Sequence, residues 1–457
     1  MNRESTDASG SPRNSVFPAG LHYAFWFGAL NALSFPIVQN SPMVLFAKSL
    51  GASATVLGII AGMMPLLVIS QIPAANYIQR VGYKQFVFAG WGTRVMFIFG
   101  IALVPLTGGF LDRSNQLALV IALLFCFNLS RGISSCAWLP WLTELVPPQM
   151  RGRFLVRDAA TTNFGCFVAF LISAALLAGD TRPWQFSLLF AFSGLAGVAS
   201  LTFLKRIPDV PIVEAVRASQ TRVPWMAMIQ HPPFKKLLRS VIAWSVAYGG
   251  MTAFTVAYLR VEVGLSETTI LLVTSVAFLG GLSTLGFLGH RLDRLGSKPV
   301  LTFAFGAWIL VLAGWVALAG RAVGMKLVLV LLLQFFMGLL AALVNMSNNR
   351  LAMVVIPKMG RNHFFALYNV VGNVTLGVAP IAWGILIDAI GSRETIWMGV
   401  AWNRYTIFFA GAAAAFVVAM LISRFLEEPE AVSMEELLRE LLIQSPQRIW
   451  LRFWPRS

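Results

Sequence analysis

Charged side chains are scarce in this sequence, as are the residue types that bind metals or form disulfides. Of its 457 residues 12% are charged, and the chain has 19 acids, four histidines and three cysteines. An average soluble domain devotes about a quarter of its residues to charged side chains. Cys126, Cys136 and Cys166 lie in apolar stretches without metal-binding spacing, so we interpret them as small core residues. We therefore expect no disulfide scaffold, no metal site and no cofactor.

Apolar residues are abundant instead, at 57% of the chain. So much apolar surface exceeds what one water-soluble core could bury, which predicts contact with lipid. A transmembrane helix needs about 20 mostly apolar residues. Runs of this kind predict twelve spans, near residues 20–47, 53–78, 85–107, 116–140, 158–180, 184–205, 237–262, 267–289, 299–320, 325–350, 363–389 and 403–425. The first twenty residues lack the apolar region of a cleaved signal peptide.

The cations are distributed unequally between the predicted loops. Of the 35 Lys and Arg residues, 25 fall on the side of the N-terminus, eight on the opposite side, and two, Arg94 and Arg131, inside helices. Cytoplasmic loops carry the excess of Lys and Arg in membrane proteins. The bias places both termini in the cytoplasm and explains the net charge of +16 without nucleic acid, since the cations face anionic lipid. Short external loops without an Asn-x-Ser/Thr acceptor fit a cell inner (plasma) membrane.

The two halves of the chain repeat one another in their loops. The segment 147–154, PPQMRGRF, follows the fourth span, and its counterpart 357–364, PKMGRNHF, follows the tenth. Likewise 80–84, RVGYK, follows the second span and 294–298, RLGSK, the eighth. Such a parallel repeat predicts two related six-helix halves. The expected domains are a cytoplasmic tail 1–19, a six-helix bundle 20–205, a cytoplasmic linker 206–236, a second six-helix bundle 237–425 and an amphipathic cytoplasmic tail 426–457.

The loop after the eighth span, residues 289–298 with the sequence GHRLDRLGSK, resembles the loop motif of the major facilitator superfamily, Gly-x-x-x-Asp-Arg-x-Gly-x-Lys. The loop after the second span carries a degraded copy, in which Ala75 and Gln79 replace the first Gly and the Asp. The resemblance covers about residues 20–425. It implies an all-α membrane protein with twelve transmembrane helices in two six-helix pseudo-symmetric halves, and transport by alternating access.

Charged residues in and beside these loops are the candidate gating residues. Asp293 can accept hydrogen bonds from a neighbouring helix N-terminus, and Arg294 and Lys298 can pair with that acid. Such a cluster would form a latch that breaks as the halves rock; the alternative is that these residues only set the topology. The candidates are Arg80, Lys84, Arg151, Asp158, Asp293, Arg294, Lys298 and Arg361.

Polar residues inside the spans are the candidate substrate-binding residues, because a polar group in lipid is costly without a partner or a function. In the family that the loops resemble, helices 1, 4, 7 and 10 line the cavity, and Pro36 and Pro42 can loosen the first of these. Amides beside aromatic rings suit a hydroxyl-rich or mixed polar ligand, although the same amides can instead hold helices together. The candidates are Asn31, Ser34, Gln39, Asn40, Asn128, Arg131, Trp244, Tyr248, Thr252, Gln334, Asn345, Asn369 and Asn373.

Arg94 and Arg131 are expected at a similar depth, roughly 13 Å from the cytoplasmic face at about 1.5 Å per helical residue. Two cations in the membrane need counter-charges, and Asp158 is the nearest predicted partner. One hypothesis is that Arg131 receives an anionic group of the substrate. The alternative is a structural pair with Asp158, which is the interpretation that we favour for Arg94.

Together these features predict a secondary transporter that moves a small polar organic solute by rocker-switch alternating access. One alternative is an organic-anion exchanger that uses Arg131, and another is a non-transporting assembly or delivery factor of the same fold. The chain has no Gly-x-Ser-x-Gly or phosphate-binding loop, so an enzyme is not expected. No carboxylate is expected in mid-membrane, which leaves facilitated diffusion, exchange and sodium coupling open. The expected partners are a small-molecule substrate and membrane lipid, with no nucleic acid, and we expect a monomer.

Overall fold

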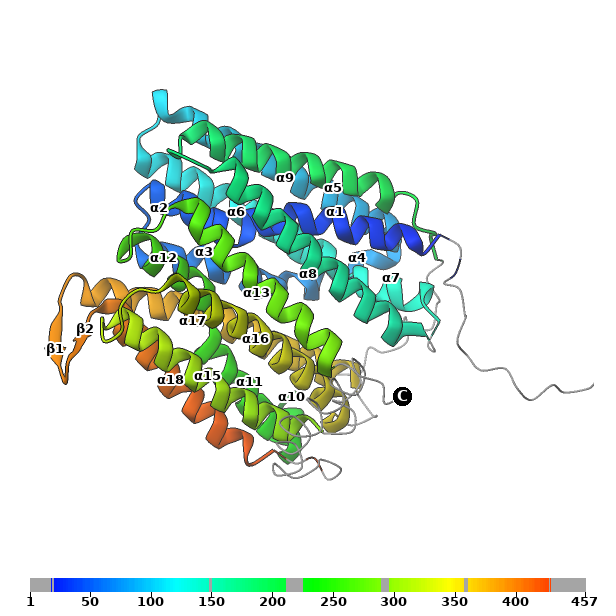
Figure 1. Cartoon of the computed structure of the whole chain (residues 1–457). Coiled ribbons are helices and arrows are strands. Elements are labelled where there is room, and N and C mark those ends of the chain that lie inside the picture. The colour runs from blue at the N-terminus through cyan, green and yellow to red at the C-terminus, as the bar shows by residue number, and fades with distance from the viewer. Residues whose placement is uncertain are drawn as a thin grey trace, which may run out of the picture.

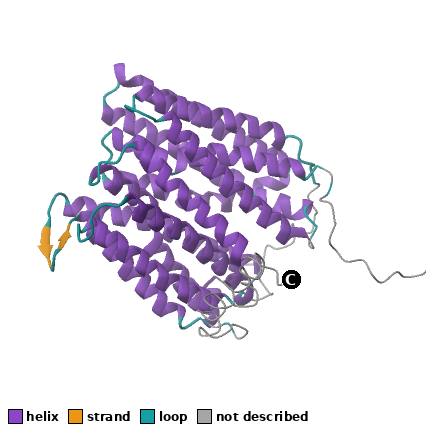
Figure 2. Ribbon diagram, in the orientation of Figure 1, coloured by secondary structure: helices purple, strands orange, loops and turns teal. Residues whose placement is uncertain are grey.

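The computed structural model describes residue 18 and residues 20–147, 150–210, 225–288, 296–356, 361–426 and 428. In this part of the chain, long helices run side by side between two ends of the molecule, and a short β-hairpin projects from one end (Figures 1 and 2). Eleven of the described helical segments are long and apolar enough to cross a membrane. The first predicted span is present as two shorter helices. The predicted all-α fold of a multi-pass membrane protein is therefore confirmed.

The helices of the first half come in chain order along residues 22–204. They are α1 (His22–Gln39), α2 (Ser41–Ser49), α3 (Ala54–Leu66), η1 (Leu67–Ser70), α4 (Gln71–Val81), α5 (Tyr83–Leu103), η2 (Val104–Gly109), α6 (Arg113–Ser135), α7 (Trp138–Leu145), α8 (Arg151–Leu176) and α9 (Pro183–Leu204).

The second half repeats this series and adds two short strands before its last helix. Its elements are α10 (Trp225–Gln230), α11 (Pro232–Tyr248), α12 (Met251–Val261), α13 (Glu267–Leu288), α15 (Ser297–Ala319), α16 (Leu327–Val355), α17 (Arg361–Ile390), β1 (Thr395–Trp397), β2 (Val400–Trp402) and α18 (Arg404–Ser423). The strands pair antiparallel, with Ile396 opposite Ala401.

Local signals explain where several of these helices begin. The side chain of Ser53 accepts from the amide of Val56 at the start of α3, and Asn403 accepts from the amides of two residues in the first turn of α18. Gly82 and Gly296, which belong to the repeated loop motif, adopt nearly the same backbone before α5 and α15, with φ of 91° and 82°. The two loops that resemble each other in sequence therefore also share a backbone conformation at this glycine.

The two halves meet through a few helix pairs. Within the first half α1 packs on α8 and α9, and within the second half α11 packs on α17 and α18. Between the halves α3 packs on α17, α8 on α13, and α2 on α12. We call the end of the bundle that carries β1 and β2 the hairpin end, and the opposite end, where α7 and α10 lie, the terminal end (Figure 1).

Candidate functional site

Two helices are broken near the middle of the bundle. The first span is interrupted at Asn40, between α1 and α2, where Pro42 supplies no N–H to continue the helix. The seventh span is interrupted at Gly249 and Gly250, between α11 and α12, and Gly250 has the left-handed φ of 78° that glycine adopts without strain. The breaks occupy equivalent places in the two halves, and both expose main-chain groups at the interface between them.

Two cavities lie between the halves beside these breaks. The larger of the two has a volume of about 400 Å³. Its walls come from α8 of the first half, from α13 and α16 of the second half, and from residues at both breaks. The polar residues that line it are Asn40, Ser41, Asn163, Tyr248, Thr252, Thr274, Gln334 and Asn345. Phe170 of α8 and Phe278 of α13 form part of its wall and contact each other across the two halves, with ring centroids 5.0 Å apart.

A smaller cavity of about 250 Å³ lies on the other side of the breaks, towards α3, α6 and α17. Its polar lining residues are Gln39, Asn40, Asn128, Tyr248, Thr252 and Asn373. Asn40, Tyr248 and Thr252 line both cavities. We call the two cavities together the central site.

Hydrogen bonds and stacking hold the lining of the central site in place. Gln39 Nε2 donates to Asn128 Oδ1 at 3.0 Å, and Asn128 Nδ2 donates to the carbonyl of Leu124 at 2.9 Å. The Tyr248 ring stacks on Trp244 with centroids 4.6 Å apart. Gln39 Oε1 and Ser41 Oγ are buried without a partner in the structure. Unpaired buried polar atoms beside a cavity suit a ligand that brings the missing hydrogen bonds.

The described residues that line the central site include no Asp, Glu, Lys, Arg or His. Recognition there must therefore use amides, hydroxyls, aromatic rings and main-chain groups. Amides both donate and accept, so a ligand with several hydroxyl, carbonyl or carboxyl oxygens is suited to this lining.

At the hairpin end the two halves are joined by polar contacts above the central site. The carboxylate of Asp388, near the end of α17, accepts from the amides of Ala54 and Thr55 at 2.9 and 2.7 Å and from Thr55 Oγ1 at 2.6 Å. These amides form the first turn of α3, where the helix dipole favours an acid. We call this contact the Asp388 latch.

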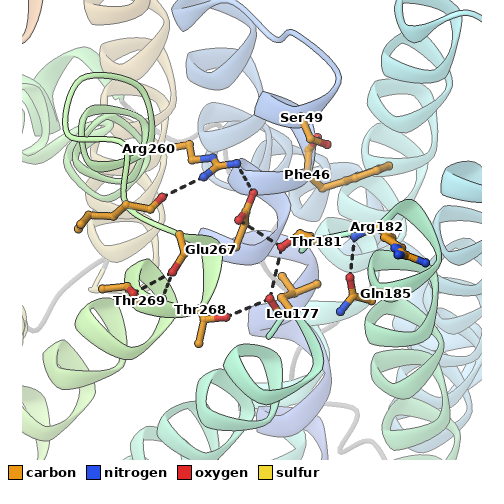
Figure 3. A network of polar contacts seen from close by, with 12 residues as sticks. Phe46, Ser49, Leu177, Thr181, Arg182, Gln185, Arg260, Glu267, Thr268 and Thr269 are labelled. Carbon is orange, nitrogen blue, oxygen red and sulfur yellow. Dashed lines mark hydrogen bonds and ion pairs between the residues drawn. The ribbon is translucent and has the colours of Figure 1, made fainter. Parts of the chain in front are cut away.

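A second set of contacts joins the α8–α9 connection to the start of α13, as Figure 3 shows. Glu267 pairs with Arg260 at 2.5 Å and accepts from Thr181 Oγ1 of the first half at 3.2 Å. Thr268 Oγ1 donates to the carbonyl of Leu177 at 3.0 Å. Both sets of contacts close the hairpin end, whereas the ribbons of the halves diverge towards the terminal end (Figure 2).

Comparison with known proteins agrees with this architecture. The family model of the Major Facilitator Superfamily matches residues 21–321 and 246–456. The chain belongs to that superfamily. The predicted family is thereby confirmed, and the two overlapping matches accord with the internal repeat.

Solved structures of the superfamily share the fold at low sequence identity. A mutant of the nucleoside transporter NupG matches with a TM-score of 0.68 and 12% identity over 90% of this chain and 100% of that chain. A D-xylose–proton symporter matches with a TM-score of 0.73 and 13% identity over 91% and 99%. The xylose transporter XylE from E. coli, in a partially occluded inward-open conformation, matches with a TM-score of 0.65 and 14% identity. The match covers 91% of this chain and 99% of that chain. No curated protein matches the sequence.

Eight of the thirteen residues predicted to bind substrate line the central site of this superfamily member. They are Gln39, Asn40, Asn128, Tyr248, Thr252, Gln334, Asn345 and Asn373. Their role in binding stays a prediction.

The other predicted residues lie away from the two cavities. Ser34 is fully buried against α9, where it bonds to Ser193, and Trp244 is buried behind Tyr248. Asn31 accepts a hydrogen bond from Arg94, and the carbonyl of Asn369 accepts one from Asn373. None of these four residues lines either cavity in this conformation, and their role in binding stays a prediction.

The two membrane arginines lie in neighbouring helices of the first half, Arg94 in α5 and Arg131 in α6. Arg94 is 2% exposed and packs over the Trp91 ring, 4.8 Å from its centroid. Arg131 lies about one helical turn beyond Asn128 in α6, and it lines neither cavity. In the described part of the chain, neither arginine forms the ion pair with Asp158 that the sequence suggested.

The predicted gating residues that the structure describes lie at the terminal end. Asp293 and Arg294 fall outside the described residues, as do the side chains of Arg151 and Arg361. Arg80 is exposed, and Lys84 and Asp158 are half-buried. The amides of Ser297 and Lys298 donate to Glu428 Oε2 at 2.8 and 2.7 Å. The latch at Asp293 therefore stays a prediction.

Sequence reasoning missed several residues of the central site and of the hairpin end. Ser41, Asn163 and Thr274 line the larger cavity, although α8 and α13 were not expected to contribute. Asn163 could have been found as a mid-span amide. Asp388 and Glu267 gave no signal beyond being acids near the ends of spans, since their contacts with Thr55 and Thr181 join them to the other half.

Proposed function

We propose that this protein is a secondary transporter of a small polar organic solute. The observation that carries the proposal is the central site, an uncharged, amide-lined pair of cavities between two halves that meet at broken helices. The solved relatives described as a nucleoside transporter and a xylose transporter support the same broad class of solute. Transport, rather than catalysis, is the activity that this arrangement suits.

The mechanism that we propose is alternating access by rocking of the two halves. The Asp388 latch and the Thr181–Glu267 contact hold the hairpin end shut. With the terminal end in the cytoplasm of a cell inner membrane, as the Lys and Arg bias favours, this conformation faces inwards. Rocking would break the contacts at the hairpin end and bring the loops of the terminal end together.

The coupling mode follows from the side chains that face the cavities. None of the described lining residues is a carboxylate or a histidine, which are the usual proton carriers in a membrane. We therefore propose facilitated diffusion, exchange or sodium coupling. Uptake into proteoliposomes with and without a pH gradient tests this; strict dependence on the gradient contradicts it.

A second candidate function is exchange of organic anions with Arg131 as the anion-binding residue. Arg131 has no ion pair with Asp158 and lies one turn from Asn128. Under this alternative, Arg131→Gln abolishes uptake of anions and spares neutral solutes; unchanged transport kinetics remove it.

The decisive experiment for transport is flux of radiolabelled solutes into proteoliposomes that contain the purified chain. A panel of sugars, polyols, nucleosides, organic acids and amino acids covers the proposed class. Saturable uptake of at least one solute supports a transporter. Absence of flux for every solute favours the non-transporting alternative, an assembly or delivery factor.

A further inference from the structure

The N-terminal ends of two short helices meet at the central site. α2 begins at Ser41 and α12 begins at Met251, directly after the breaks in the first and seventh spans. The two helices pack against each other, one from each half. Ser41 lines the larger cavity, and the first residues of α12 line the smaller one.

The start of α12 presents a cluster of unpaired amides to the smaller cavity. The first bond of this helix runs from the amide of Phe254 to the carbonyl of Gly250, at 2.9 Å. The amides of Met251, Thr252 and Ala253 therefore have no acceptor within the helix. All three residues, with Gly250, line the smaller cavity.

The start of α2 adds donors from the other half. Met43 and Val44 both bond back to the carbonyl of Asn40, at 3.0 and 3.2 Å, which leaves the amide of Ser41 without an acceptor in the helix. The Ser41 side chain is 0% exposed, lines the larger cavity, and its Oγ has no partner in the structure. A buried hydroxyl without a partner is costly, and a ligand oxygen would satisfy it.

The C-terminal end of α1 supplies hydrogen-bond acceptors beside these donors. The carbonyl of Val38 would normally accept from the amide of residue 42, but Pro42 has none. Gln39 Oε1 is buried without a partner, and the Gln39 amide nitrogen donates to Asn128 Oδ1. Val38 and Gln39 both line the smaller cavity. A ligand that fits here needs hydrogen-bond donors as well as acceptor oxygens.

The electrostatic balance favours a carboxylate over a neutral oxygen at the amides. Each helix N-terminus carries the equivalent of about half a positive charge, and such ends are common anion-binding sites. Bonds from amides to a charged oxygen are roughly twice as strong as bonds to a neutral one. No acidic side chain among the described lining residues opposes an anion.

We propose that the solute is a small carboxylate that also carries hydrogen-bond donors, namely a hydroxy acid or an amino acid. Its carboxylate binds the main-chain amides at the starts of α2 and α12, and its hydroxyl or ammonium groups bind Gln39 and the free carbonyls at the end of α1. This inference rests on the proposed transport function and narrows it, and it assigns anion recognition to the main chain rather than to Arg131.

Matched pairs of probes test the inference on the purified full-length protein in nanodiscs. Affinities are measured by calorimetry for gluconate against sorbitol, and for L-serine against ethanolamine, which differ by the carboxylate. We expect the acid of at least one pair to bind about tenfold or more tightly than its partner, and the pair that responds distinguishes a hydroxy acid from an amino acid. Equal or tighter binding of sorbitol and ethanolamine, the members without a carboxylate, overturns the inference. Failure of both acids to bind while another polar solute is transported also overturns it. Absence of flux for every solute overturns the transport function itself.

Main-chain recognition is tested by a matched pair of variants at Thr252. Thr252→Pro removes one amide at the position where α2 itself carries Pro42, whereas Thr252→Val keeps the amide and removes the hydroxyl. We expect the affinity of the acid relative to its partner without a carboxylate to fall by about fivefold or more in the Pro variant and to persist in the Val variant. A ratio that is unchanged in the Pro variant contradicts main-chain recognition.

A second variant covers the case in which the proline variant does not fold. Ser41→Ala removes the unpaired hydroxyl of α2 at nearly constant volume, and we expect it to weaken binding of the acid several-fold. Arg131→Gln separates the two anion hypotheses. Acid preference that survives in this variant supports the main-chain site, and its complete loss assigns the anion to Arg131 instead.

Discussion

At the scale of single residues, the polar side chains inside the membrane divide into two groups. Ser34 and Asn31 bond to neighbouring helices, Ser34 to Ser193 and Asn31 to Arg94, and so hold the first half together. Gln334 and Asn345 of α16 face the larger cavity instead. Both uses remove the cost of a polar group in lipid, which is why residue type alone does not separate them.

Asn345 is a test of the cavity assignment. Asn345→Ala removes a donor and acceptor from the larger cavity, and we expect the KM for the transported solute to rise roughly two- to tenfold, the effect of one neutral hydrogen bond. Uptake kinetics in proteoliposomes measure it. Asn115→Ala, an exposed asparagine at the start of α6, is the matched control. Equal kinetics for both variants would remove Asn345 from the site.

At the scale of secondary-structure elements, helix ends carry much of the organisation. α2 and α12 begin at the central site because Asn40 and Gly250 interrupt longer spans. α15 begins at the terminal end, where Glu428 accepts from the amides of its first two residues and pairs with Arg350 of α16. The segment after α18 is thereby tied to two other helices of the same half.

Glu428 should matter for stability because its side chain is only 2% exposed in the pair with Arg350. Glu428→Gln removes the charged carboxylate that pairs with Arg350 and accepts from the first two amides of α15, and bonds to a charged group are worth about 1.5–3 kcal/mol each. We expect the Tm in detergent to fall by roughly 5 °C or more. Glu394→Gln breaks the pair with Arg321, where the carboxylate is 34% exposed, and should shift the Tm by no more than about 2 °C. Similar shifts for both would contradict the structural role of Glu428.

At the scale of the whole molecule, contacts between the halves would set the balance between the two facing states that we propose. At the hairpin end these include the Asp388 latch and the Thr181–Glu267 contact. Close helix packing supports them: a Cβ on Gly62 of α3 would lie 2.3 Å from the carbonyl of Gly377 in α17. Rocking of one half against the other would break all of these contacts at the same time, because each of them joins the first half to the second.

Asp388→Asn should shift this balance towards a state that is open at the hairpin end. The neutral amide loses charge-assisted bonds to the start of α3, each worth about 1.5–3 kcal/mol, so the population changes roughly tenfold or more. Distances between spin labels at Ser114 and Ser392, in a variant without the three native cysteines, report the opening. Asp112→Asn at the same end is the control, since Asp112 makes no side-chain cap bond. An unchanged distance distribution would exclude the latch.

The sequence by itself determined the membrane-spanning class, the internal repeat and the family, because these depend on local hydrophobicity and on short loop motifs. It also indicated the break in the first span through Pro36 and Pro42, since proline acts on its own helix. The break at Gly250, and the choice between cavity and packing for each amide, depended on tertiary structure. Likewise Ala54 and Thr55, which bind Asp388, and Thr181, which binds Glu267, lie more than eighty residues away in the other half. Only the docking of the two halves brings such groups together, because helical periodicity shows which residues share a face and not what that face meets.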